Sequence, residues 1–175
     1  MRTISTFFII AGFIIACSQN TGTGKTDKSP EENIRNQVIT IATDYASAQL
    51  PGAKKSTDKN GIVSMKGDEF NYLIDPSKII ISELDEDPEK DAIIPLNLLR
   101  GATPVNTEHL IMISKEGKLV IATTIYNVIK ILKIEDRIIV AEITKVGMDS
   151  PSYGCAECIE IVKYRFLGGE LVKTE

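Results

Sequence analysis

The sequence predicts an α+β fold in which one N-terminal amphipathic helix packs on a curved antiparallel sheet of about six strands. A helix N-cap pattern at Ser29 is followed by apolar residues at helical spacing as far as Tyr45. Beyond residue 61 the helical period does not return, and short apolar runs separated by turn residues follow. This part of the chain has the length of one domain, so we expect a single globular domain over residues 29–175.

The helix is expected to run from residue 30 to about residue 50. Ser29, Pro30 and Glu32 occupy the N-cap, N1 and N3 positions of a capping box. Pro51 and Gly52 together break the helical pattern. We expect one face of the helix to lie across the sheet, and its apolar residues are Ile34, Val38, Ile41, Ala42 and Tyr45.

The remaining residues predict a mainly hairpin-connected sheet. Two short strands and an apolar run are expected at residues 70–74, 78–84 and 93–99. Three hairpins follow, joining 109–114 to 119–125, 128–134 to 138–146, and 159–166 to 171–173. By fold-level analogy this arrangement resembles a cystatin-like or nuclear-transport-factor-like cone.

The first seventeen residues have the pattern of an export signal. Arg2 gives a short positive region, and residues 7–15 form an apolar run that is too short to span a bilayer. Ile14, Ala16 and Cys17 then place a branched apolar residue and a small residue before a cysteine. This pattern resembles the bacterial lipobox, and we favour it over two alternatives, an ordinary secretory signal and an uncleaved N-terminal helix.

The lipobox resemblance implies removal of the signal peptide, residues 1–16, and acylation of Cys17, which would attach the protein to a membrane. Residues 17–28 would then be the lipidated cysteine and a flexible tether, because 18–28 contain no apolar residue. The implied location is the bacterial cell envelope, with the outer membrane preferred and a periplasmic or surface-facing domain.

The net charge limits the classes of partner, and the cysteine content predicts a disulfide. The formal net charge is −4 and no basic cluster occurs, so we expect no nucleic-acid partner. Cys155 and Cys158 remain as a pair in an oxidising compartment, where we expect a disulfide. A Cys-x-x-Cys redox module is the alternative, but the residues that follow alternate as a strand, whereas a reactive cysteine of this kind sits at a helix N-terminus.

A dense acidic segment spans residues 83–92. Its spacing resembles the nine-residue Asp-x-Asp-x-Asp-Gly-x-x-Asp calcium loops of FG-GAP-type repeats, with Glu in the first position and Pro88 in place of glycine. The resemblance implies calcium ligation by the Glu89 carbonyl and by the side chains of Glu83, Asp85, Asp87 and Asp91. The other interpretation is a solvated acidic turn that needs no metal.

The last hundred residues, from Asp75-Pro76 through the acidic loop to the ending at 164–172, resemble a family of uncharacterised bacterial lipoproteins, which implies no particular activity. The single histidine, His109, begins an expected strand, and we interpret it as a partly exposed residue and not as a general base. No catalytic residue is assigned. We therefore expect a non-catalytic binding or scaffold domain of unknown ligand; the alternatives are an envelope enzyme with a site in the mouth of the sheet and the redox module.

Overall fold

The computed structural model describes residues 29–126, 128–146 and 155–174. Within them it has one α-helix, two short 3₁₀ helices and eleven strands arranged in two antiparallel sheets. The predicted α+β class with a single N-terminal helix is confirmed. The prediction of one sheet with about six strands is wrong, because the described chain divides its strands between a large and a small sheet.

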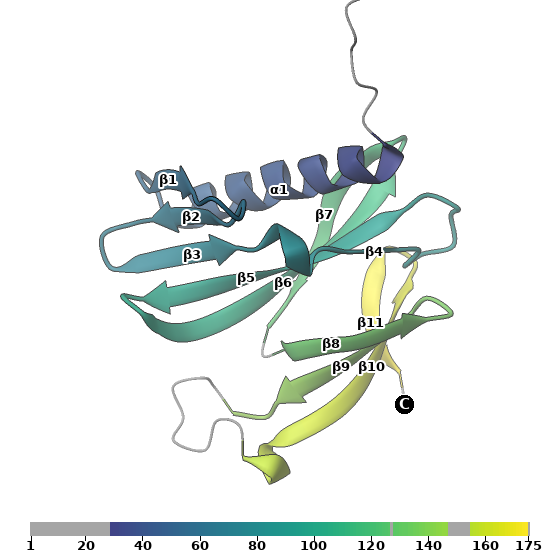
Figure 1. Cartoon of the computed structure of the whole chain (residues 1–175). Helices are drawn as coiled ribbons and strands as arrows, with labels where there is room; N and C mark the ends of the chain where they lie inside the picture. The colour runs from purple at the N-terminus through teal and green to yellow at the C-terminus, as the bar shows by residue number, and fades with distance from the viewer. Residues whose placement is uncertain (1–28, 127, 147–154, 175) are drawn as a thin grey trace, which may run out of the picture.

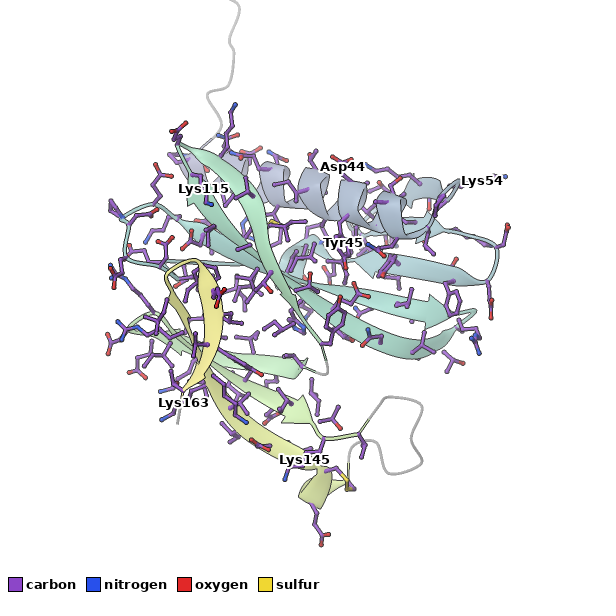
Figure 2. All side chains as sticks on the ribbon, turned by 180° about the vertical axis from the view of Figure 1, so that it is seen from behind. Asp44, Tyr45, Lys54, Lys115, Lys145 and Lys163 are labelled. Atoms are coloured by element: carbon purple, nitrogen blue, oxygen red, sulfur yellow. A yellow bond between two sulfur atoms is a disulfide. The ribbon has the colours of Figure 1, made fainter. Side chains whose placement is uncertain are left out.

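Helix α1 (Pro30–Gln49) begins and ends as its sequence predicts. The Ser29 hydroxyl accepts a hydrogen bond from the Glu32 amide at 3.2 Å, which caps the first turn. The predicted apolar face is also confirmed: Val38 and Ala42 are fully buried, and Ile34, Ile41 and Tyr45 pack around them. Asp44 lies on the solvent side of the helix, whereas Tyr45 lies on the side that faces the sheet (Figure 2).

The large sheet has the strand order β1-β2-β3-β5-β6-β7, and a short strand, β4, also pairs with β5. Its strands are β1 (Lys54–Thr57), β2 (Val63–Lys66), β3 (Phe70–Ile74), β4 (Ile80–Ser82), β5 (Asp91–Arg100), β6 (Thr103–Lys115) and β7 (Lys118–Ile125). The 3₁₀ helix η1 (Pro76–Lys78) joins β3 to β4.

The small sheet has the order β11-β10-β9-β8. Its strands are β8 (Val128–Glu135), β9 (Ile138–Thr144), β10 (Ile159–Leu167) and β11 (Glu170–Thr174), and the 3₁₀ helix η2 (Ala156–Cys158) precedes β10. Figure 1 shows α1 along one side of the large sheet and the small sheet on the other side. Strands β5 and β6 therefore contribute to two of the apolar clusters formed by the described residues, one beneath α1 and one beneath the small sheet.

Strands β5 and β6 are buried on both faces because each face has its own cover. Ile94 and Leu110 belong to the core beneath α1, whereas Ile93 and Ile111 pack against the small sheet. This double burial explains why residues 93–99 form a nearly continuous apolar run with no alternation.

The sequence predicts too few strands for physical reasons. All four residues of β1 are exposed, so the strand carries no apolar alternation and is held by its ladder with β2. The expected strand at 78–84 is shorter in the structure, since η1 includes Lys78 and β4 covers only Ile80–Ser82. The three predicted hairpins are all present, with positive φ angles at their turns.

Candidate functional site

A cavity of about 400 Å³ lies between the face of the large sheet opposite α1 and strand β8 of the small sheet. Strands β5 and β6 line it on one side, and β8 and the segment from η1 to β4 complete it. The lining residues are Lys78, Ile80, Ile93, Pro95, Asn97, Thr107, His109, Ile129, Lys130 and Ile131. The volume falls within the range of small-molecule sites, about 300–1,000 Å³.

The register between β5 and β6 places polar and apolar side chains together on the sheet face that borders the cavity. The pairs of β5 and β6 residues on this face are Ile93 with Ile111, Pro95 with His109, and Asn97 with Thr107. The first pair is packed beneath the small sheet. In the last pair the Thr107 hydroxyl donates to Asn97 Oδ1 at 3.0 Å. The face therefore changes from apolar to polar along the two strands.

Pro95 is located where β5 lacks a partner on one side. The β3 ladder reaches β5 at Leu96, and the β4 ladder ends at Ile93. A proline has no amide hydrogen, so this gap is where it interrupts the fewest ladder hydrogen bonds.

His109 is the buried polar group of this cavity. Its side chain is 4% exposed, and Nδ1 has no hydrogen-bond partner. Burial lowers the pKa of the imidazole to about 4, so the ring is neutral at pH 7. The expectation of a partly exposed histidine is wrong, because the small sheet covers the β6 face that carries it.

A larger hollow, of about 520 Å³, opens beside the β8–β9 turn. Its lining is mostly charged and includes Glu83, Lys90, Asp136, Arg137 and Arg165. Lys90 and Glu83 already form an ion pair there at 2.7 Å. This hollow has little apolar surface, and its charged groups are of both signs. The cavity of His109 is therefore the better candidate for a ligand site.

Glu108, the neighbour of His109, faces the opposite core. Its carboxylate accepts hydrogen bonds from Tyr45 at 2.8 Å and Tyr72 at 2.9 Å. Burial and then this carboxylate raise the pKa of Tyr72 well above its ordinary range, and burial with Glu108 does the same for Tyr45. The two hydroxyls therefore stay protonated as donors. Sequence reasoning missed this network because the partners lie 63 and 36 residues away.

The acidic segment forms the loop between β4 and β5, and the side chains of all five predicted ligand residues have protein partners. Lys90 pairs with Glu83 and lowers the pKa of that carboxyl. Glu89 accepts from the Ser114 hydroxyl and from the Gly117 amide at 3.2 Å, which ties the loop to the β6–β7 hairpin.

Asp91 is fully buried. It accepts from the amides of Leu84 at 2.7 Å and Ser114 at 2.9 Å, and burial raises its pKa. Asp85 and Asp87 each accept from the amide two residues ahead, as Asx turns do.

The structure does not gather these carboxylates into a cage. No three His, Cys, Asp or Glu side chains within residues 29–126, 128–146 and 155–174 are grouped closely enough to hold a metal ion. The contacts favour the solvated acidic turn over the calcium loop, and calcium binding stays a prediction to be tested.

Cys155 and Cys158 form a disulfide, as expected from the sequence, with their Cα atoms 5.2 Å apart. The Cys158 carbonyl accepts from the Lys145 amide at 2.9 Å, which extends the β9–β10 ladder. Strand β10 follows η2 directly, so no α-helix begins at this pair. Cys17 and the export signal lie outside the described residues.

No protein-family model, curated protein or solved structure matches this chain. The resemblances to cystatin-like and nuclear-transport-factor-like folds and to the lipoprotein family therefore stay predictions. Among the residues that the structure describes, no helix is long and apolar enough to cross a membrane.

Proposed function

We propose that this chain is a lipid-anchored protein of the bacterial cell envelope whose folded domain binds a small molecule in the cavity of His109, without catalysis. The observation that carries the binding function is the cavity itself. Five aliphatic or proline side chains line it, and they surround a buried imidazole whose Nδ1 has no partner. A buried polar group without a partner costs about 1–3 kcal/mol, so the unbound site has a polar group that a ligand could satisfy.

The lipid anchor is supported by the sequence alone. Arg2, the apolar run at residues 7–15 and the lipobox-like ending at Cys17 occur together and in order. Acyl chains on Cys17 would hold the domain at a membrane, the outer membrane by preference, through the tether at residues 18–28. Intact-mass analysis of the membrane-extracted protein tests the anchor. We expect loss of residues 1–16 and added acyl mass, and an unlipidated soluble protein would contradict it.

The alternative function is an enzyme with its active site in this cavity, with His109 as the candidate general base. A general base works best with a pKa near the operating pH, whereas burial lowers the pKa of His109 to about 4. Among the residues that the structure describes, no carboxylate lines the cavity to orient or charge the ring. These two features support binding over catalysis.

The redox alternative rests on Cys155 and Cys158, which are half-buried and bonded to each other. A titration of the reduced protein distinguishes it, because a redox module requires a thiol with a pKa well below the usual 8.5. Ordinary thiols at both positions would leave the disulfide as a structural link.

The single histidine makes the binding proposal directly testable, because His109 gives the only imidazole signals in an NMR spectrum. We would titrate the Cys17→Ser chain, which cannot be acylated, with 1-octanol and separately with octanoate. At least one probe should shift the imidazole resonances saturably. Thr107→Phe, which fills the cavity, should abolish the shift, whereas Thr57→Phe on exposed β1 should not. An imidazole that responds to neither probe would contradict the proposal.

A further inference from the structure

We propose that the ligand of this cavity is a small carboxylate with an aliphatic body, and that Lys78, Lys130 and Asn97 supply the donors for its carboxylate. This inference rests on the proposed binding function and specifies its ligand class. Its evidence is the chemistry of the lining residues: the charges among them, their hydrogen-bonding state and the apolar walls.

Two charged residues are found in the described part of the cavity lining, and both are lysines. Lys78 and Lys130 are exposed, and neither makes an ion pair or a side-chain hydrogen bond within the described part of the chain. Glu142 is aligned with Lys130 in the neighbouring strand, but no ion pair among the described residues joins the two. The chain as a whole carries 24 acidic and 20 basic residues, so a cavity with two lysines and no carboxylate departs from the overall charge. Such a site attracts an anion.

Asn97, one of the neutral polar residues that line the cavity, adds donors. One lone pair of Asn97 Oδ1 accepts from the Thr107 hydroxyl, and both amide N–H groups of Asn97 can donate to a ligand. A carboxylate has only acceptors when ionised and can take hydrogen bonds from an ammonium and an amide at once. A cationic ligand would be repelled by the two lysines.

The remaining walls define the rest of the ligand. Ile80, Ile93, Ile129 and Ile131 are half-buried or buried, and Pro95 follows Ile93 by two residues on β5. Burial of the apolar surface of a ligand against these aliphatic walls favours binding. A free sugar or an inorganic anion would leave these walls without a partner, whereas an alkyl or branched aliphatic body would cover them.

Octanoate and 1-octanol form a matched pair of probes, because they share a chain length and differ in charge. We would compare their affinities for the Cys17→Ser chain from the shifts of the His109 imidazole. Octanoate should bind roughly three- to tenfold more tightly, as expected for two partly exposed charge pairs. Added salt should weaken octanoate and leave 1-octanol nearly unchanged.

The Lys78→Gln/Lys130→Gln double variant should remove the preference for octanoate. The control is Lys59→Gln/Lys163→Gln, which changes the net charge equally at exposed lysines that do not line the cavity. Equal binding of both probes to the parent chain, or a preference that survives in the Lys78/Lys130 variant, would overturn the carboxylate inference and leave the binding function standing. No response to either probe would instead overturn the binding function.

Discussion

Acidification should destabilise this protein through His109, because this side chain cannot take up a proton without placing a charge in a buried position. Its pKa is about 4 in the folded protein, against 6.5 for an ordinary histidine. The unfolded chain therefore binds this proton at a higher pH than the folded chain does. Stability must then rise with pH across that interval and fall as the pH decreases.

The size of the effect follows from the two pKa values. Each pKa unit corresponds to about 1.4 kcal/mol, so the interval from 6.5 to about 4 amounts to about 3 kcal/mol. At 4% exposure the imidazole is poorly screened by solvent, so this figure is not reduced for exposure. The contribution should be fully present above pH 6.5 and lost progressively down to about pH 4.

Urea unfolding at a series of pH values measures this loss. Carboxylates also titrate in the range, so the informative quantity is the difference between the parent chain and the His109→Gln and His109→Phe variants. The variants should lose about 3 kcal/mol less than the parent between pH 7 and pH 4. The imidazole can also be titrated directly by NMR in the folded parent chain. A folded-state pKa near 6.5, or identical pH profiles for parent and variants, would refute the reasoning.

Three other perturbations test separate parts of the structure. Tyr72→Phe should lower the free energy of unfolding by about 1–3 kcal/mol, because the buried Glu108 carboxylate loses a hydrogen-bond donor. The same substitution should cost less in a Glu108→Gln background. Equal costs in this double-mutant cycle would argue against a charge-assisted hydrogen bond. Arg137→Gly should raise stability by about 1 kcal/mol in urea unfolding, because Arg137 has a φ of 63° in the β8–β9 turn; a loss would show that its side chain contributes more than the strain costs. Millimolar calcium should leave the unfolding temperature unchanged, and a rise that Asp85→Ala/Asp87→Ala lacks would place the ion in the acidic loop.

The parts of the fold that the sequence predicts are those set by local interactions. The Ser29 cap, the apolar face of α1 and the hairpin turns each depend on residues a few positions apart. The division into two sheets depends instead on which strands become edges. The change of sheet falls between β7 and β8, with only residues 126–127 between them, and those residues contain no glycine or proline to mark it.

The candidate site also depends on contacts between residues far apart in the chain, so the sequence pattern does not predict it. His109 becomes buried because strands that begin at residue 128 cover its face of β6, and its strand pattern does not contain that information. Lys78 and Lys130 reach the same cavity from elements 52 positions apart in the chain. The acidic loop shows the converse case: its spacing resembles a calcium loop, but Asp91 is used to join Leu84 to Ser114.

The most direct test of the binding site is where a bound aliphatic carboxylate lies. Intermolecular nuclear Overhauser effects from the methylene protons of octanoate should connect to the His109 ring and to the methyl groups of Ile93 and Ile129. Exposed apolar residues of the small sheet provide the competing outcome, because Ile161 is 63% and Leu167 is 42% exposed. Contacts to the cavity residues are the predicted result. Contacts to Ile161 and Leu167 alone would show that octanoate binds the surface and would contradict the assignment of this cavity.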